Sequence, residues 1–443
     1  MLDAGALLFD NSALSAGREE EQARINAQGL VEAYNLLGYE AVGISTIDLL
    51  AGIDFLQQLH EKSIFPWLSA NLVHPESKQP FFTPYILKEK NGLRIAIIGI
   101  TGTEPKYGAR GQEKYLILPW RDVLPKLLEE LRGKADVYIL LSSESKQENQ
   151  LIAKDFNNIH IIIQSGTNAH NENPVLTNNT LICQTEKQGK YLGKMRINWN
   201  SSAIWANKSI DTAVLQKQEY DRIAWQIKRL QEKGDPEQVY KDKPATLKAY
   251  YKLAERMKIL EEETRKQQTG KNQATENATF EHNFLEVEPT IADDPTIEKI
   301  TKETKNKINA IGRKESRDNT IQPDHVGSQA CMSCHEEIAK RWQLTPHARA
   351  YETLVKKDQQ FNANCLPCHV TGISMEDKNK SLSLPDTLHN VGCESCHGPG
   401  KKHVENPEKW KLNGLPGKPL CLQCHLPEHD DSFDYDKDSK LVH

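Results

Sequence analysis

The sequence predicts an α/β domain, then a helical connecting region, then a small and mostly helical C-terminal module. Apolar strand-like runs alternate with amphipathic helices over residues 1–215, which is typical of α/β domains. Residues 216–324 are rich in charge, and residues 325–443 contain four short cysteine motifs. A chain of 443 residues is long enough for two or three such parts.

Hydrophobic spacing places the helices and strands of residues 1–215. Leu30, Tyr34 and Leu37 recur at helical intervals before Gly38, a common helix stop. Helices are expected over 19–37, 47–62 and 120–132, and strands over 41–44, 67–71, 93–100, 136–141 and 159–163. The runs 174–184 and 191–198 are expected to close the domain as an antiparallel hairpin across 187–190.

The connecting region, 216–324, is predicted to be largely helical. Helical periodicity with many charges covers 216–233, 244–266 and 296–311. The stretch 284–289 can add one strand, 268–278 is a polar segment, and 312–323 is a charged linker.

The C-terminal part carries four copies of the pattern C-x-x-C-H. In this pattern two thiols can add across the vinyl groups of a haem, and the following histidine can ligate its iron. The expected attachment residues are Cys331, Cys334, Cys365, Cys368, Cys393, Cys396, Cys421 and Cys424. The expected proximal iron ligands are His335, His369, His397 and His425. The sequence therefore predicts four c-type haems, which would form much of the core of residues 325–443.

Structural zinc is the alternative use of paired cysteines. Zinc does not require a histidine directly after every second cysteine, and histidine makes up only 15 of the 443 residues. Four such placements by coincidence are improbable, so the motifs favour haem. The ninth cysteine, Cys183, lies in an apolar run and is expected to be an inert buried thiol.

The sixth ligand of each iron sets its potential and its reactivity. Methionine raises the potential of a haem, whereas a second histidine leaves it lower. The methionines of this part are Met332, inside a motif, and Met375, in a polar stretch. The candidate distal ligands are therefore the spare histidines His347, His403, His325, His443 and His429, with His389 ranked last. We expect low-potential haems, mostly with two histidine ligands, and an iron lacking a sixth protein ligand would be open to a small molecule.

Residues 325–443 resemble the multihaem cytochromes of the cytochrome c-554 type. The resemblance lies in 326–331, Trp342, 345–348, 365–371, 392–400 and 421–433. It implies haems packed in near-contact pairs that pass electrons between partner redox proteins. It also implies that one haem can be five-coordinate.

The N-terminal part resembles the catalytic domain of 5′-nucleotidase-type metallophosphatases. The resemblance lies in 3–9, 32–43, 68–72 and 94–100. It implies a four-layer sandwich in which two central sheets are flanked by helices.

The metal ligands of that second family are not reproduced. A two-metal phosphatase needs carboxylate, Asn and His ligands around a pair of ions. The matching positions hold Ala6, Ser45, Thr46 and Ser143, and residues 164–168 read Gln-Ser-Gly-Thr-Asn. Asp48, His160 and His170 remain, which is too few to hold two metals. We therefore expect a scaffold or docking domain without catalytic metals or phosphatase activity.

Composition and chemistry restrict the partners and the location. The net charge of −5 argues against nucleic acid as a partner, and no run approaches the length of a membrane span. Because haem is attached to C-x-x-C-H outside the cytoplasm, we expect an exported protein, periplasmic or extracellular. Residues 1–9 have neither the basic start nor the apolar segment of an export signal, so we expect the sequence to be mature or truncated at its start.

Together these patterns predict an α/β four-layer metallophosphatase-like sandwich, a helical linker region and a mostly α, haem-cored tetrahaem cytochrome module. The expected function is electron transfer between redox partners, such as other cytochromes or quinol-linked membrane complexes. One alternative is a haem enzyme whose open-site iron acts on a small nitrogen or sulfur compound. Another is a subunit of a stacked-haem polymer, which would be a homo-oligomer.

Overall fold

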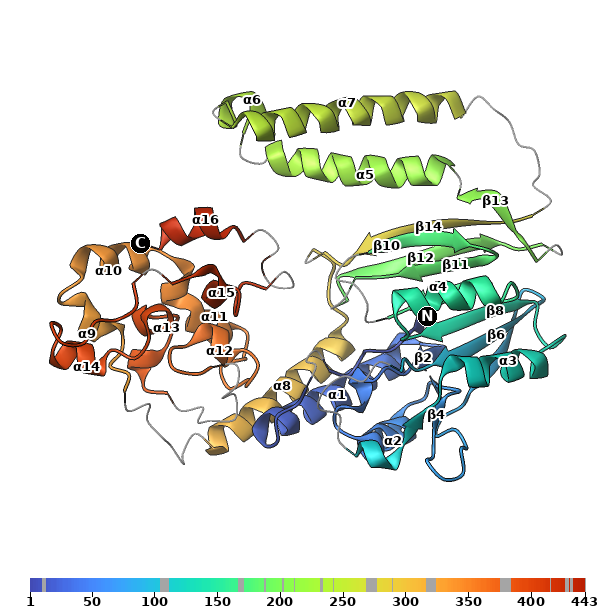
Figure 1. The fold of residues 1–443 in the computed structure, drawn as a ribbon, viewed down its shortest axis with the longest axis horizontal. Helices are drawn as coiled ribbons and strands as arrows, with labels where there is room; N and C mark the ends of the chain where they lie inside the picture. The colour runs from blue at the N-terminus through green and yellow to red at the C-terminus, as the bar shows by residue number, and fades with distance from the viewer. Residues whose placement is uncertain are drawn as a thin grey trace.

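The computed structural model arranges the chain as an α/β domain, a projecting helical hairpin and a small helical module (Figure 1). It describes residues 1–9, 13–103, 111–165, 171–186, 189–200, 203–210, 212–231, 234–241, 243–267, 277–288, 290–315, 324–374, 384–414, 416–426, 430 and 433–442.

Two sheets lie at the centre of the α/β domain. The smaller is parallel, in the order β1 (Leu2–Asp3), β2 (Ala41–Gly43), β3 (Trp67–Leu68). The larger has the order β10 (Glu172–Thr177), β11 (Thr180–Gln184), β9 (Ile161–Gln164), β8 (Val137–Ser142), β6 (Leu93–Ile100), β5 (Tyr85–Lys90). Its four inner strands are parallel and its two edge pairs are antiparallel.

Helices cover the outer face of each sheet, so the domain has four layers. Helices α1 (Arg18–Leu37) and α2 (Ile53–Lys62) contribute to a buried core over the small sheet. Helices α3 (Trp120–Glu130) and α4 (Lys146–Asp155) pack on the far face of the large sheet. Between the sheets lie the buried residues Ala4, Ala41, Leu68, Ile97 and Leu141. The predicted four-layer α/β sandwich is therefore confirmed.

A third sheet extends the domain and corrects one prediction. It consists of β12 (Tyr191–Asn198), β14 (Ala278–Glu286) and β13 (Trp205–Ile210), with β14 in the middle. The predicted hairpin between 174–184 and 191–198 is wrong, because β10 and β11 already form a hairpin of their own. Asn178, with a φ of 54°, makes their turn, and β12 pairs antiparallel with the distant β14 instead.

Several predicted elements are divided differently. The helix expected over 47–62 breaks into a short turn, Ile47–Leu49, and α2, because Gly52 has a φ of 91°. The strand expected over 67–71 splits into β3 and β4 (Leu72–Val73), and β4 pairs with β7 (Leu116–Ile117). Strand β5 and helix α4 were not predicted.

The connecting region forms a helical hairpin and one long helix. Helices α5 (Thr212–Gln231) and α7 (Pro244–Gln267), joined through α6 (Pro236–Val239), pack around the buried Ile223, Ile227 and Leu260. Helix α8 (Pro295–Glu315) lies along α1 (Figure 1) and extends beyond its predicted end. Residues 268–276 and 316–323 fall outside the described ranges. Among the described helices, none combines the length and apolar character needed to cross a bilayer.

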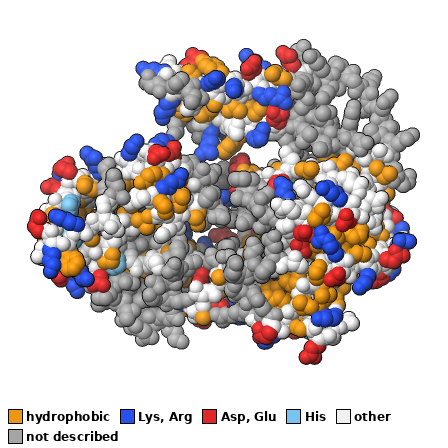
Figure 2. Space-filling view, viewed as in Figure 1, with side chains coloured by type: hydrophobic (Ala, Val, Ile, Leu, Met, Phe, Trp, Pro, Cys, Tyr) orange, Lys and Arg blue, Asp and Glu red, His pale blue; other side chains and the backbone are white. Residues whose placement is uncertain are grey.

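The C-terminal module consists of short helices. They are α9 (Ser328–Met332), α10 (Glu336–Gln343), α11 (Ala350–Lys356), α12 (Leu366–His369), α13 (Cys393–His397), α14 (Lys401–Glu405), α15 (Lys418–Cys421) and α16 (Tyr435–Asp438). Among the described residues, one apolar cluster lies around α11 and α12 and the segments that follow α12: Leu354, Leu366, Val370, Ile373, Leu384 and Leu388. On the face seen in Figure 2, acidic and basic side chains are mixed over the described surface.

Candidate haem-binding site

The C-x-x-C-H motifs adopt tight helical turns. In the first motif the amide of His335 donates to the carbonyl of Cys331 at 3.1 Å, and in the fourth the amide of His425 donates to Cys421 at 2.9 Å. Helix α13 contains the whole third motif. Residues i, i+3 and i+4 of a helical turn share one face, so both cysteines and the histidine of a motif can face one ligand. This arrangement fits a haem held by two thioethers and an imidazole.

Thiols of different motifs approach one another. All nine cysteines lie in the described ranges, and no disulfide joins any two of them. Cys331 of the first motif is hydrogen-bonded to Cys393 of the third, and this bond lowers the pKa of Cys393 to about 6 while raising that of Cys331. Cys424 of the fourth motif is hydrogen-bonded to Cys368 of the second, which raises the pKa of Cys424.

A charge interaction links these two pairs. Burial raises the pKa of Cys396, in the third motif, and the charge of the nearby Cys421, in the fourth, raises it further. The motifs therefore follow one another in space in the order first, third, fourth, second. As predicted, the ninth thiol is buried, and burial raises the pKa of Cys183 to about 12.

In three of the proximal histidines, Nδ1 is hydrogen-bonded to an oxygen of the chain. Nδ1 of His369 lies 2.8 Å from the carbonyl oxygen of Ala350, and Nδ1 of His397 lies 2.8 Å from that of Asn413. Nδ1 of His425 lies 2.7 Å from a carboxylate oxygen of Asp430. A carbonyl oxygen only accepts, so Nδ1 carries the proton in the first two rings and Nε2 is left as a lone-pair donor. Such an outer partner is typical of metal-binding histidines.

Two spare histidines face proximal ones. The rings of His403 and His335 have centres 6.4 Å apart and planes inclined by 26°. Those of His347 and His425 have centres 5.8 Å apart and planes inclined by 73°. A metal lies about 2 Å from each imidazole nitrogen that binds it, so rings at these separations lie close enough for one iron to be held between them. Nδ1 of His403 also donates to a carbonyl, that of Trp410, at 2.7 Å.

His325 lies close to the third motif. The buried carboxylate of Glu394, inside that motif, accepts hydrogen bonds from the amides of Val326, Gly327 and Gly400 at 3.0, 2.7 and 2.7 Å. These bonds fold the start of the module over the third motif. Nδ1 of His325 is buried, and within the described part of the chain it has no hydrogen-bond partner. Glu394 was not identified as a functional residue from the sequence. The only feature that could have indicated its role is a charged residue at one of the two unspecified positions of the C-x-x-C-H motif.

The other candidate ligands differ. The ring of His389 stacks on Tyr351 at 3.8 Å and lies 3.7 Å from Asp386, and burial lowers its pKa. His429, His443 and Met375 lie outside the described residues. Within the described ranges, no aromatic ring stacks against His369, in the second motif.

The N-terminal domain uses its remaining carboxylate for structure. The buried carboxylate of Asp48 accepts from the amides of Ala6, Leu7, Leu8 and Ser45, each at 2.9 Å, and from the Ser45 hydroxyl at 3.0 Å. Burial raises the pKa of Asp48, and the hydrogen bonds oppose that shift. Asp48 thus fixes the loop after β1.

The nearby strand ends are joined by neutral polar groups. The Asn71 side chain donates to Thr101 O and accepts from Thr101 N, and Ser143 and Ser165 donate to backbone carbonyls of Ile44 and Ala4. Nδ1 of His160 accepts from a backbone amide, and burial lowers its pKa to about 4. His170 and residues 166–168 lie outside the described ranges. Among the described residues, no three His, Cys, Asp or Glu side chains form a metal-binding group.

Comparisons with known proteins agree with both halves of this picture. The family described as "Cytochrome c554 and c-prime" matches residues 330–398. Cytochrome c-554 of Nitrosomonas europaea is 32% identical over 133 residues, which are 23% of this chain and 57% of that protein. The metallophosphoesterase YunD of Bacillus subtilis is 28% identical over 148 residues, which are 33% of this chain and 32% of that protein.

One match among the solved structures covers much of this chain. The calcineurin-like phosphoesterase YfkN of Bacillus subtilis is 15% identical with a TM-score of 0.42, covering 70% of this chain and 84% of that one. The chain spans 57% of the length of the curated cytochrome and 32% of that of the curated metallophosphoesterase. Both resemblances read from the sequence are confirmed.

Proposed function

We propose that this chain is a tetrahaem c-type cytochrome that passes electrons between redox partners, with its metallophosphatase-like domain acting as a scaffold. The observation that carries the proposal is the series of thiol interactions from the first motif through the third and fourth to the second, two of them hydrogen bonds and one a charge interaction. Haem c supplies reversible one-electron transfer. Attachment points that interact across motifs support neighbouring haem sites that lie close together, as an electron carrier requires.

The eight motif cysteines would attach the haems, and His335, His369, His397 and His425 would be the proximal ligands. The nearby rings favour His403 as the distal ligand in the first motif and His347 as that in the fourth. The Glu394 contacts, which hold Val326 and Gly327 over the third motif, favour His325 as the distal ligand there. Imidazoles on both sides of an iron favour a low potential.

The location and the partners follow from the attachment chemistry. Because haem is attached outside the cytoplasm, the protein would be periplasmic or extracellular. Its partners would be other cytochromes or quinol-linked membrane complexes that exchange single electrons. The mixed charge of the visible surface suits transient contacts with such partners (Figure 2).

A haem count on the protein, made in a host that matures c-type cytochromes, tests the proposal. Mass spectrometry and haem absorbance should give four covalent haems per chain, and a Cys421→Ala/Cys424→Ala variant should have three. Because the fourth motif lies between the third and the second, this variant should also exchange electrons more slowly between its remaining haems after flash reduction. Bound zinc in place of haem would contradict the proposal.

A second candidate function rests on His369. Its Nδ1 is held by Ala350 O and lies 3.3 Å from the Thr353 hydroxyl, and no described aromatic ring faces it. If the second-motif iron is open on its far side, the protein would act on a small nitrogen or sulfur compound. Hydroxylamine, nitrite or CO should then shift a high-spin absorbance band, and a fully low-spin protein without such a shift would exclude this function.

The scaffold role of the N-terminal domain has its own test. The neutral side chains of Asn71, Ser143 and Ser165 are already bonded to the chain, and Asp48 is occupied by five donors. Added Mn²⁺ or Zn²⁺ should therefore leave the melting temperature unchanged, and nucleotides should not be hydrolysed. Two bound metal equivalents with nucleotide hydrolysis would overturn the scaffold role.

A further inference from the structure

We propose that Gln22, on helix α1 of the α/β domain, is a positioning residue for the second haem site. Its side chain fixes the loop that leads into Cys365, so the potential of the haem attached there depends on the α/β domain. This inference rests on the proposed function, in which Cys365 and Cys368 hold a haem.

The Gln22 amide joins the two parts of the chain with both of its ends. Nε2 donates to the carbonyl of Phe361 at 2.8 Å, and Oε1 accepts from the amide of Ala363 at 2.9 Å. Nε2 also lies 3.3 Å from Ile308 O on α8. Gln22 is 4% exposed, and a buried polar group that loses its hydrogen-bond partner is destabilised. These bonds therefore hold one defined position of the loop.

The loop transmits that position to the second motif. Asn362, between the two residues bound by Gln22, accepts from the amides of Cys365 and Leu366 at 3.1 and 3.2 Å. The Asn362 side chain donates to Gln359 at 2.7 Å, which closes the loop on itself. Because Ala363 is 1% exposed, the loop is covered on the side that faces the α/β domain. A displacement at Gln22 would thus move the first attachment cysteine of this motif.

Helix α8 adds a second line of contact. Asn309 donates from its side chain to Asp358 O at 3.0 Å, and the guanidinium of Arg313 lies 5.6 Å from the centre of the Phe361 ring. Both residues face the loop that Gln22 binds. The loop is therefore held from two helices, and neither of them belongs to the C-terminal module.

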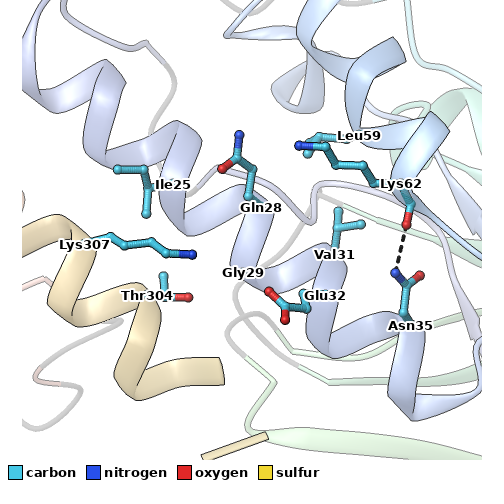
Figure 3. A pocket seen from close by; sticks show the side chains of 10 residues that line it. All are labelled: Ile25, Gln28, Gly29, Val31, Glu32, Asn35, Leu59, Lys62, Thr304 and Lys307. Atoms are coloured by element: carbon cyan, nitrogen blue, oxygen red, sulfur yellow. Dashed lines mark hydrogen bonds between the residues drawn. The ribbon is translucent and has the colours of Figure 1, made fainter. Parts of the chain in front are cut away.

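Helices α1 and α8 pack closely against each other because α1 has a glycine, Gly29, at their contact. A Cβ at Gly29 would lie 2.3 Å from the Thr304 hydroxyl oxygen, so any larger residue would push the helices apart. Figure 3 shows Gly29 and Thr304 at this contact, on the wall of a cavity of about 290 Å³ between α1, α2 and α8. The close contact at Gly29 keeps Gln22 and Asn309 on the same side of the loop.

The position of this loop matters for a haem because solvent access and local dielectric tune its potential. The second motif interacts with the fourth through Cys368 and Cys424, and the loop before it is in addition bonded to the α/β domain. A change at Gln22 should therefore act mainly on the haem of the second motif.

The test compares Gln22→Leu and Gln22→Glu with Gln28→Leu in the full-length haem-loaded protein. Gln28 is an exposed residue of the same helix, so its variant reproduces the chemical change without the contact. Gln22→Glu keeps the volume and the acceptor for the Ala363 amide, but places an oxygen against Phe361 O. Each variant is titrated by potential-controlled absorbance, and amide hydrogen exchange is followed at Ala363 and Cys365.

Both Gln22 variants should shift one of the four midpoint potentials and raise amide exchange at Cys365. Gln22→Leu, which removes the acceptor of the Ala363 amide, should also raise exchange at Ala363 about tenfold. The shifted component should be the one missing from a Cys365→Ala/Cys368→Ala variant. Gln28→Leu should match the parent protein. Four haems with unchanged potentials in both Gln22 variants, or equal shifts of all four, would overturn the inference. Fewer than four haems in the parent would instead overturn the proposed function.

Discussion

The imidazole of His403 faces that of His335 across a ring-centre separation of 6.4 Å, and its Nδ1 is held by the carbonyl of Trp410. Helix α14, which follows the third motif, thus carries its histidine back to the first motif. The pairing gives a direct test of the distal ligand assignment.

Replacing His403 by alanine should leave the first-motif iron with one protein ligand. We expect the haem count to stay at four while one haem changes from low spin to high spin, measured by EPR and by the long-wavelength absorbance band. His389→Ala is the matched control, because that ring stacks on Tyr351 and should leave the spin state unchanged. A low-spin His403→Ala protein would refute the pairing.

Glu394→Gln should destabilise the C-terminal module. Its buried carboxylate accepts three backbone amides, and replacing one oxygen by an NH₂ group places a donor against a donor. Because hydrogen bonds to charged groups are the stronger ones, we expect a loss of about 2 kcal/mol in the free energy of unfolding, measured with denaturant. The exposed Glu405→Gln on α14 serves as control, and an equal loss there would exclude a specific role for Glu394.

Asp430→Asn should raise the potential of one haem. A carboxylate bonded to Nδ1 makes the His425 imidazole a stronger donor, which favours oxidised iron, and a neutral amide removes that charge. Potential-controlled absorbance should show a single component moving upward. Asp438→Asn changes the same charge on α16 and should not move it. A downward shift in the Asp430 variant would contradict this prediction.

His160 should make the α/β domain acid-sensitive. Burial lowers its pKa from 6.5 to about 4, so the folded domain binds the proton less readily than the unfolded chain. Its stabilising contribution is therefore complete above pH 6.5 and is lost as the pH falls towards 4, by about 3 kcal/mol in total. The difference in unfolding free energy between the parent and His160→Gln should change over this interval. A difference that is constant with pH would show that the buried ring does not titrate there.

Gly29→Ala should weaken the contact between α1 and α8. Alanine is the better helix former, but its Cβ would overlap the Thr304 hydroxyl, and overpacking of this kind costs about 1–3 kcal/mol. We expect a lower melting temperature and faster proteolysis of α8. At Gly414 a Cβ would meet no atom within 4 Å, so Gly414→Ala is the control. A more stable Gly29→Ala protein would mean that α8 is not tightly packed.

Local patterns predicted local structure well and distant pairing poorly. The strand predicted over 93–100 has the same bounds as β6. An apolar run that directly follows a glycine turn is a clear signal for the start of a strand. The pairing of β12 could not be predicted, since its partner β14 lies far along the chain and no local pattern selects it. Strand β5 had a usable signal in Asn91-Gly92, which forms its turn to β6.

In the candidate site, too, local features could be predicted from the sequence and contacts between distant residues could not. The attachment motifs are readable because covalent haem chemistry needs neighbouring residues in a fixed order. The facing of His403 and His335 and the Gln22 contact join residues distant in sequence, so only the fold reveals them. Glu394 lies between these cases, since it is inside a motif but acts on amides at the start of the module.

The two contacts of helix α8 restrict insertions and deletions within that helix. Thr304 faces α1, whereas Asn309 and Arg313 face the loop before Cys365, so one helix carries two contact faces in a fixed phase. Each inserted or deleted residue would rotate the second face by about 100° and shift it by about 1.5 Å. Among homologues that keep both contacts, the stretch from Thr304 to Arg313 should therefore vary in side chains but not in length.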